Sequence, residues 1–395
     1  MNFKIFSIPL ITLSLFLNSC GSSSSSSNKT ATFEIENKTF LHELFLSEYL
    51  WYDQVASNVD YTQYSSPHMM INTLRIMPPD QWSFALTAQE YEDFENQNTS
   101  GFGIGYTQDL TIFLVRIDAP AYGKLFRGDK ILEVNSKAAT QVLITQTSEN
   151  VGHETVFTVL RGAQEVQVSV TPRAYSYKVS LGKIIPQGSK NIAYLRYDAF
   201  TESSVSEFEA IFSTFKSANV NELVIDMRYN GGGSISTASA LLDNISNVNA
   251  GKRQVYLDWN ANYKHNNTNY YFEDADMQDG NELNMKRVIF LVTYNSASSS
   301  ELIISALRPY LGSTNVVTVG SATHGKPVGM SGRIDGEFYY FLVNFYVRNN
   351  AAETTSFYGI PATCTAEDDL SHIMGDVNEE MLSTALYYIT HNVCP

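Results

Sequence analysis

Residues 295–326, NSASSSELIISALRPYLGSTNVVTVGSATHGK, decide the interpretation of this 395-residue chain. An apolar run at 288–292 precedes them and predicts a buried strand, and from Glu301 onward apolar residues recur at helical spacing. A second apolar strand at 316–319 leads into a turn that contains Lys326. Four serines occupy the first turn: Ser296, Ser298, Ser299 and Ser300. The stretch thus predicts strand, helix and strand, with hydroxyls after the first strand and an amine after the second.

Hydroxyl and amine groups in these two turns suit nucleophilic chemistry. A serine at a strand-to-helix turn lies where helix-start amides can stabilise a developing oxyanion. A lysine buried at the end of the next strand has a lowered pKa and, as a free amine, can take the serine proton. A structural interpretation stays open, because Ser298-x-x-Glu301 also fits a helix capping box. His324, next to the lysine turn, is a further candidate for a role in the site.

The start of the chain resembles an export signal. Residues 1–19 combine a positive charge with a short apolar core that ends at a lipobox-like LNSC, so Cys20 is the expected lipidation site. The apolar run is too short to span a bilayer comfortably. A serine-rich tether at 20–36 then has no fold to assign. A secreted protein with an unmodified Cys20 is the alternative.

The cysteines, the histidines and the net charge limit which disulfides, cofactors and partners we expect. Cys364 and Cys394 are expected to form a disulfide in an oxidising compartment, with two separate thiols as the alternative. No cysteine and histidine cluster has metal spacing, so we expect no metal and no other cofactor. The formal charge is -15, and removing the signal peptide with Lys4 makes it one unit more negative. Such acidity argues against nucleic acid or an anionic membrane face as a partner.

Three helices are expected near the amino terminus, at 40–54, 67–76 and 88–95, from the spacing of their apolar residues. They predict a small helical domain over 37–98. Trp82, between the second and third helices, is interpreted as a packing anchor for this domain.

The next segment, 99–174, is predicted to be rich in short strands. A glycine loop, GFGIG, precedes a strand at 111–116 and the sequence RGDKIL, and a strand pair follows at 155–161 and 164–172. This order resembles a PDZ domain. The resemblance implies that a peptide adds to a sheet edge while loop amides hold its terminal carboxylate. Those loop residues are Phe102, Gly103, Ile104 and Gly105.

An α/β pattern begins at 191. A strand at 192–196 and a helix at 203–218 precede a buried strand that runs from Glu222 to Asp226. Three glycines follow shortly afterwards, and a helix is expected at 238–242. Consecutive glycines let the backbone turn tightly and present bare N–H groups, although an ordinary loop held by an Asp226–Arg228 pair would also fit.

Three motifs occur in order behind the PDZ-like segment: DMRYNGGG, SASSSE and THGK. Together they resemble the carboxy-terminal-processing, or tail-specific, serine peptidases. The resemblance implies a Ser298 nucleophile, a Lys326 base, and an oxyanion hole of Gly232 or Gly233 with Ser299. It also implies a multidomain α/β (α+β) protein whose core, 175–395, has a crotonase-like ββα-spiral fold.

Two positions depart from that pattern. Many relatives carry a glutamine where this chain has Met330, and often a glycine where it has Pro327, so we assign no third catalytic residue. The expected protein is a lipid-anchored serine endopeptidase of a bacterial cell envelope, facing the periplasm or the exterior. It would cleave exported or unfolded protein substrates near their carboxy-terminal tails. The alternative is a non-catalytic lipoprotein that binds peptides or apolar ligands, and the oligomeric state stays open.

Overall fold

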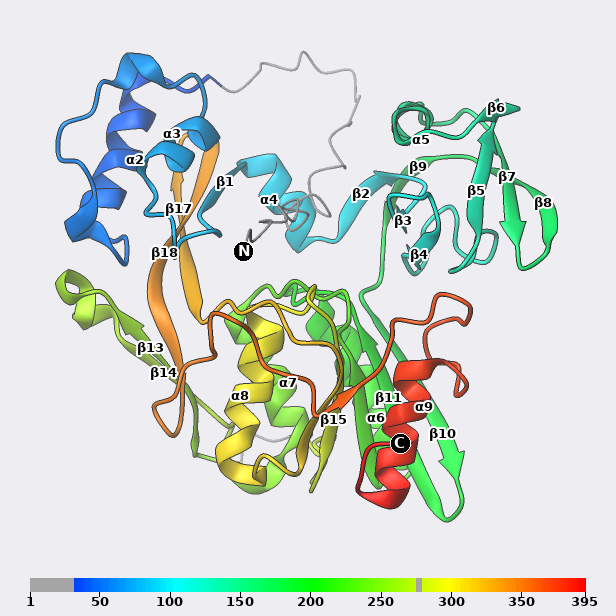
Figure 1. The fold of residues 1–395 in the computed structure, drawn as a ribbon. Helices are drawn as coiled ribbons and strands as arrows, with labels where there is room; N and C mark the ends of the chain where they lie inside the picture. Colours follow the sequence, from blue (N-terminus) through cyan, green and yellow to red (C-terminus); the bar gives the residue numbers. More distant parts are fainter. Residues whose placement is uncertain (1–31, 275–278) are drawn as a thin grey trace, which may run out of the picture. The chain divides into compact units, whose positions relative to one another are not determined.

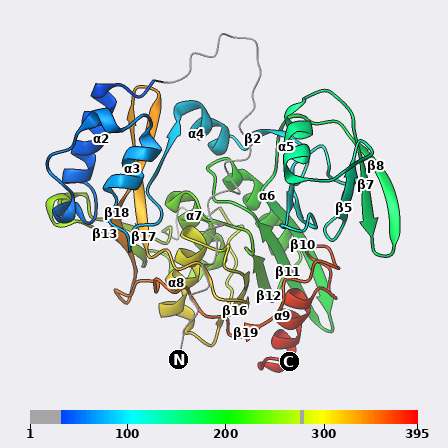
Figure 2. The ribbon, with the colours of Figure 1, turned by 45° about the horizontal axis from the view of Figure 1, so that its top comes forward.

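The computed structural model describes residues 32–274 and 279–395, and they form two compact units (Figures 1 and 2). One unit holds 98–177 with 370–373, and the other holds the rest. Cys20 and the expected signal peptide lie outside the described residues, so the lipidation and export predictions stay predictions. Within 32–274 and 279–395, no helix is both long and apolar enough to cross a bilayer.

The larger unit is built on a six-stranded sheet with the order β10-β11-β12-β15-β16-β19. Its first pair is antiparallel and every later pair is parallel. Three central strands are buried along their whole length, as a parallel sheet covered on both faces requires. The strands are β10 (Ser180–Gln187), β11 (Lys190–Tyr197), β12 (Glu222–Asp226), β15 (Val288–Val292), β16 (Val316–Gly320) and β19 (Cys364–Thr365).

Helices cover both faces of this sheet (Figure 1). The helix α9 (Glu380–His391) packs with Met381 and Ile389 into a cluster that includes Ile185 of β10. On the opposite face, Ile211 of α6 lies against Gly182, where a side chain would meet it at 2.4 Å. The helices after the central strands are α6 (Ser204–Ser217), α7 (Ile235–Ile245) and α8 (Ser299–Leu311).

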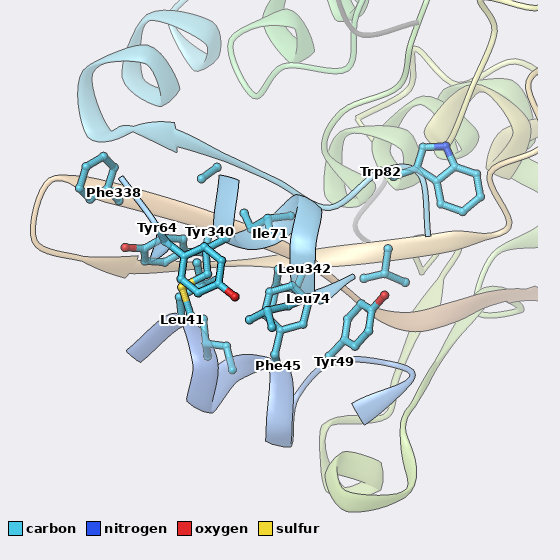
Figure 3. Close-up of a cluster of buried hydrophobic side chains, with 14 of the residues drawn as sticks. Leu41, Phe45, Tyr49, Tyr64, Ile71, Leu74, Trp82, Phe338, Tyr340 and Leu342 are labelled. Atoms are coloured by element: carbon cyan, nitrogen blue, oxygen red, sulfur yellow. The ribbon is translucent and has the colours of Figure 1, made fainter. Parts of the chain in front are cut away.

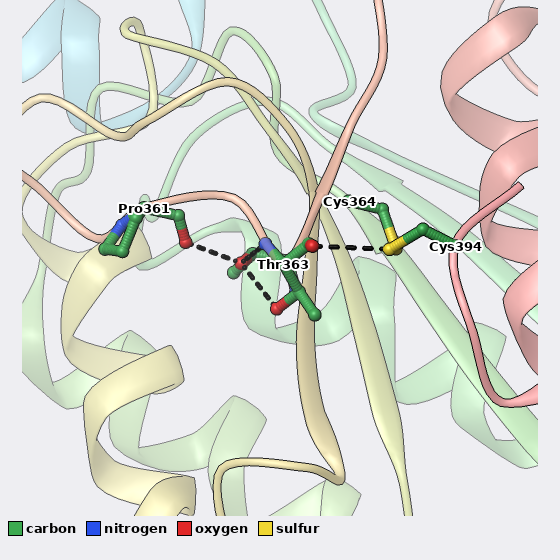
Figure 4. The surroundings of a disulfide bond; sticks show 5 residues. Pro361, Thr363, Cys364 and Cys394 are labelled. Atoms are coloured by element: carbon green, nitrogen blue, oxygen red, sulfur yellow. Dashed lines mark hydrogen bonds between the residues drawn. A yellow bond between two sulfur atoms is a disulfide. The ribbon is translucent and has the colours of Figure 1, made fainter.

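A disulfide fastens the end of the chain to the sheet (Figure 4). Cys364 lies in β19 and Cys394 follows α9, and their Cα atoms are 5.5 Å apart. The predicted pairing is confirmed.

A second sheet of the larger unit carries the amino-terminal helices. Its long hairpin, which sequence reasoning left unassigned, pairs β17 (Val328–Asp335) with β18 (Phe338–Asn349). The remaining strands are β1 (Phe84–Thr87), β13 (Arg253–Trp259) and β14 (Thr268–Tyr271). The helices α2 (Ile35–Ser47) and α3 (Pro67–Leu74) pack on it through the aromatic and aliphatic cluster of Figure 3, and α4 (Ala88–Glu95) follows β1.

The first helix differs from its prediction over 40–54. It begins at Ile35 and ends at Ser47, because Leu50 N donates a hydrogen bond to Val343 O and so draws the chain onto β18. Local spacing gave no sign of this contact, since its partner lies almost 300 residues away in the sequence.

The smaller unit has its own apolar core, which includes Phe102, Ile131 and Phe157. The strand pair β7 (Thr155–Arg161) and β8 (Gln164–Val170) confirms the predicted hairpin. Residues 370–373 belong to this unit, where Arg127 Nε donates to His372 O at 3.2 Å. Its other elements are β2 (Asn98–Gly101), β3 (Ile104–Tyr106), β4 (Ile112–Val115), β5 (Lys130–Val134), β6 (Lys137–Ala138), α5 (Gln141–Glu149) and β9 (Arg173–Ser176).

Candidate active site

Three turns meet at the carboxyl ends of β12, β15 and β16, which is where ligands bind in parallel α/β sheets. Ala297 N donates to Asn230 O at 3.1 Å, and His324 N donates to Ser296 O at 2.9 Å. The glycine turn approaches so closely that a side chain on Gly232 would lie 2.7 Å from the Cβ of Ser298. The structure therefore brings the three motifs together.

The four serines of the second turn have different surroundings. Three of them donate their hydroxyls to main-chain carbonyls of the glycine turn at 2.7–2.9 Å: Ser296 to Met227, Ser299 to Gly233 and Ser300 to Asn230. The hydroxyl of Ser298 donates to no acceptor among the described residues, and it lines a pocket together with Lys326. Geometry thus singles out Ser298 from its neighbours.

The backbone at Ser298 is strained. Its φ of 57° and ψ of -114° lie in a region that residues with a side chain rarely adopt. Such conformations cost about 1–3 kcal/mol and are found where the surrounding contacts enforce them. Here the enforcing contacts are the neighbouring serines and Glu301, and the sharp turn directs the Ser298 side chain to the pocket.

Glu301 joins the serine turn to the lysine turn. Its carboxylate is fully buried and accepts a hydrogen bond from Ser298 N at 3.1 Å, the carboxylate half of the predicted capping box. The same carboxylate accepts from Thr323 Oγ1 at 2.5 Å and from the amides of Gly325 and Lys326, both at 2.8 Å. Sequence reasoning found the capping role and missed the link to the second turn.

Lys326 is a buried base with an unusual environment. Across the described parts of the chain, its Nζ makes no hydrogen bond and no salt bridge, and its side chain lines the same pocket as Ser298. Burial lowers the pKa of Lys326 to about 8, and the negative charges of Asp80 and Glu301 oppose that shift. About a tenth of the lysine is therefore neutral at pH 7, and the neutral fraction grows as the pH rises toward 8.

His324 serves the structure of the turn through contacts with two aromatic side chains. Its Nε2 accepts a hydrogen bond from Trp82 Nε1 at 3.1 Å, and its ring also contacts Tyr294, with 4.7 Å between centroids. Burial lowers the pKa of His324, which keeps the ring neutral and able to accept. Trp82 is the packing anchor that the sequence predicts, and it adds a polar contact to the lysine turn.

The predicted oxyanion hole needs one correction. Gly232 N already donates to Asn230 Oδ1 at 2.8 Å, so this amide is engaged within its own turn. The amides of Gly233 and Ser299 donate to none of the described residues, and Ser299 N lies 3.1 Å from the position that a Gly232 Cβ would take. These two amides are the candidate donors.

Two family models match this chain. Residues 191–361, which contain the three turns, match peptidase family S41, and residues 37–84 match the S41 peptidase amino-terminal domain. The chain belongs to peptidase family S41. The predicted resemblance to the carboxy-terminal-processing serine peptidases is confirmed at the level of the peptidase family.

Relatives and solved structures agree with this membership. A carboxy-terminal-processing protease of Bartonella bacilliformis is 23% identical over 290 residues, covering 68% of this chain and about 63% of the relative's length. A protein of Bacteroides fragilis designated as an S41 protease has a TM-score of 0.79 at 22% identity, covering 90% of this chain and 97% of that one. The photosystem II D1 carboxy-terminal processing protease has a TM-score of 0.51 at 14% identity, covering 84% and 92%. The two structures show the fold, which is mixed α+β as predicted.

The position where many S41 relatives carry a glutamine is apolar in this chain. Met330 lies in β17, paired with Val343 of β18, and its side chain packs against the amino-terminal cluster. It offers no polar group to Lys326.

The predicted carboxylate loop of the smaller unit is partly engaged. Phe102 N donates to Ser148 Oγ of α5 at 3.3 Å, and the Phe102 ring is buried in the core. Gly103 O accepts from Arg116 N, and Ile104 and Gly105 belong to β3, which pairs with β4. At Phe102, therefore, the amide that the sequence predicts to bind a carboxylate has an internal partner.

Proposed function

We propose that this S41 chain is a serine endopeptidase in which Ser298 is the nucleophile and Lys326 is the general base. The observation that carries the proposal is the pocket that both side chains line. One wall presents a serine in a strained turn, and another presents a lysine whose pKa is lowered to about 8 by burial. A neutral amine beside a hydroxyl is what proton abstraction at moderate pH requires.

The acylation step follows from these groups. Lys326 Nζ takes the proton from Ser298 Oγ as that oxygen bonds to the carbonyl carbon of the substrate. The amides of Gly233 and Ser299 stabilise the negative charge on the carbonyl oxygen. The C–N bond then breaks, and the lysine returns the proton to the leaving amine. Lys326 Nζ then takes a proton from water as the water oxygen bonds to the acyl carbon; the bond from that carbon to Ser298 Oγ breaks, the lysine returns the proton to Oγ, and the acid product leaves.

The pocket suggests a preference for substrates with apolar side chains. Beyond the two reactive groups, its lining is largely aliphatic, with Val255, Leu302 and Val347 contributing. An apolar side chain next to the scissile bond would remove these surfaces from water, at about 25 cal/mol per Å². A basic side chain would lose its hydration there and would meet the like charge of protonated Lys326.

The wider setting of the enzyme rests on the sequence. We propose a lipoprotein of the bacterial cell envelope, anchored through Cys20, with a crotonase-like core and a PDZ-like smaller unit that holds substrate tails. The name of the Bartonella relative, a carboxy-terminal-processing protease, supports cleavage near the carboxyl ends of substrates. We propose exported or unfolded proteins as those substrates because the chain starts with an export-like signal.

The test is hydrolysis of an unfolded model protein together with labelling by a fluorophosphonate probe, with the modified peptide identified by mass spectrometry. Wild type is expected to hydrolyse the protein and to carry the label on Ser298. Ser298→Ala is expected to lose both, with an unchanged melting temperature. Ser217→Ala, at an exposed serine near the end of α6, is the matched control and should behave as wild type.

Two results would overturn the proposal. Turnover in Ser298→Ala at the wild-type rate would remove the nucleophile assignment. A folded wild type that neither hydrolyses protein nor reacts with the probe, even after deletion of 101–172, would favour the non-catalytic binding protein.

A further inference from the structure

Asp80 is a fully buried carboxylate that the proposed chemistry does not use. Its Oδ1 accepts from the amides of Trp82 and Ser83, at 2.9 and 3.0 Å. Its Oδ2 accepts from Tyr49 Oη at 2.8 Å and from Ser83 Oγ at 2.6 Å. All four donors are neutral, and no arginine or lysine in the described residues bonds to this carboxylate. A buried negative charge in such a setting calls for a cation nearby. Arg75, whose charge acts on Tyr49, is one such cation, and Lys326 is another.

Two routes connect Asp80 to the lysine turn. Trp82, whose amide bonds to Asp80, donates its indole N–H to His324, two residues before Lys326. In Figure 3 this indole lies at the opposite end of the amino-terminal cluster from Phe338. Ser83 bonds to Asp80 and accepts from Val343 N at 3.1 Å, and Val343 pairs with Met330 on the strand that follows Lys326. Both routes end within four residues of the lysine.

The charges around Lys326 come from two separate elements. Glu301 on α8 bonds to the lysine turn, and Asp80 precedes β1, from the amino-terminal part of the chain. The carboxylates of Asp80 and Glu301 both oppose the lowering of the Lys326 pKa by burial, and neutral His324 lies on the same turn as the lysine.

We propose that Asp80 is the positioning residue of Lys326, holding the amine toward Ser298 by charge attraction, with Trp82 and Ser83 fixing the carboxylate relative to the lysine turn. The inference rests on the proposed role of Lys326 as the base. It makes the amino-terminal domain part of the active site, because the carboxylate reaches the lysine only when α2, α3 and the following segment pack on the β17–β18 hairpin.

A purely structural role for Asp80 makes a different prediction. The Oδ1 contacts form a turn of the kind that aspartate and asparagine both make with amides two and three residues ahead. Asparagine at position 80 would preserve that turn and could still bond to the two hydroxyls. If the turn were the whole function, removal of the charge would leave the titration of Lys326 unchanged.

The experiment compares Asp80→Asn with Asp60→Asn, a matched control in the same domain. Asp60 is an exposed carboxylate with neutral donors only, from Thr62 and Gln63. In the full chain, competitive acetylation by acetic anhydride across pH, read by mass spectrometry, reports the pKa of Lys326. This titration is made in the Ser298→Ala variant, so that it does not depend on turnover. The pH profile of kcat is measured separately, with Ser298 present.

Asp80→Asn is expected to lower the pKa of Lys326 by about one unit, since loss of a nearby opposite charge disfavours the ammonium form. The rising limb of the kcat profile moves to lower pH by the same amount, and the plateau falls about tenfold while KM stays close to wild type. Asp60→Asn is expected to change neither quantity.

The outcomes separate the two proposals. An unchanged lysine titration in a folded Asp80→Asn protein overturns the positioning role even if Ser298 and Lys326 prove catalytic. A shifted titration in a protein without peptidase activity overturns the proposed function and leaves the charge coupling intact. Melting temperature and circular dichroism establish that each variant is folded. If Asp80→Asn does not fold, Asp80→Ser replaces it, because serine also removes the charge and can still form the turn, and the same titration criterion applies.

Discussion

Two buried cations follow strands of the same sheet, and they are treated in opposite ways. Arg228, after β12, has no exposed surface and forms salt bridges with Asp226, Asp368 and Glu379 at 2.7–2.8 Å. Lys326, after β16, has no salt bridge within the described residues. Arg228 is thus paired with carboxylates, whereas Lys326 is unpaired among the described residues and lines a pocket.

The pKa values of the two cations follow this difference. Burial alone would lower the pKa of Arg228, but the charge of Asp226 and the hydrogen bonds of Glu379 outweigh it and raise that pKa. At Lys326 burial prevails over the more distant charges, and its pKa falls to about 8. Arg228, which is paired, stabilises the fold, whereas Lys326, which is not, can release its proton at moderate pH.

The largest expected effect is that of Lys326→Met on turnover. Loss of the base should lower kcat/KM by at least about 1,000-fold, as removal of a catalytic base does in other serine hydrolases. The free energy of unfolding should stay equal or rise, because methionine removes a costly buried amine. Hydrolysis assays and urea titrations on the same preparation measure both quantities. A marked loss of stability would show that Lys326 holds the fold, and the contrast with Arg228 would fail.

Arg228→Met should have the opposite pattern. It leaves the carboxylates of Asp226 and Glu379 buried without a cation, which typically costs about 3–5 kcal/mol. Urea unfolding followed by tryptophan fluorescence measures this cost. Arg228→Met together with Asp226→Asn and Glu379→Gln serves as the control, because it removes the unpaired charges and should recover part of the loss. An unchanged unfolding midpoint in the single variant would contradict the stabilising role.

The smallest effect is the pH dependence that Lys326 imparts. With a folded-state pKa of about 8, roughly a tenth of the lysine is neutral at pH 7, so kcat/KM should rise about tenfold from there to its plateau. The unfolded chain, with a lysine pKa of about 10.4, binds more protons between these values. Stability relative to Lys326→Met should therefore increase as pH rises from about 8 to about 10.4. If the stability difference between wild type and Lys326→Met did not change across this pH window, the pKa of Lys326 would not be lowered in the folded protein.

The sequence could predict much of the central sheet and the candidate dyad. The strands at 288–292 and 316–320 are continuous apolar runs, and the turns that follow them carry Ser298 and Lys326. These features are defined by residues close together in the sequence, so the pattern of apolar residues and the spacing of motifs are enough to detect them. Assignment of Ser298 among four serines came from the resemblance, and the hydroxyl contacts of the other three give it a physical basis.

What the sequence could not supply are contacts between distant segments. Trp82 reaches the lysine turn from about 240 residues away, and neither it nor Asp80, which holds its amide, has a local pattern that indicates a partner. Glu301 fitted a capping box so well that its second task, binding the amides of Gly325 and Lys326, had no separate signal. A buried polar side chain serving two turns is visible only after the chain has folded.

The charge cluster at Arg228 also has a consequence for synthesis. Two of its three carboxylates, Asp368 and Glu379, lie between the disulfide cysteines, so they leave the ribosome long after the serine and lysine motifs. Until that last stretch has emerged, Arg228 has Asp226 as its one salt-bridge partner among the described residues. A message truncated ahead of Asp368 would encode every reactive group and still yield a chain that lacks two of the three carboxylates around Arg228. The reactive groups and two of the charges that neutralise Arg228 are therefore encoded in separate stretches of the sequence.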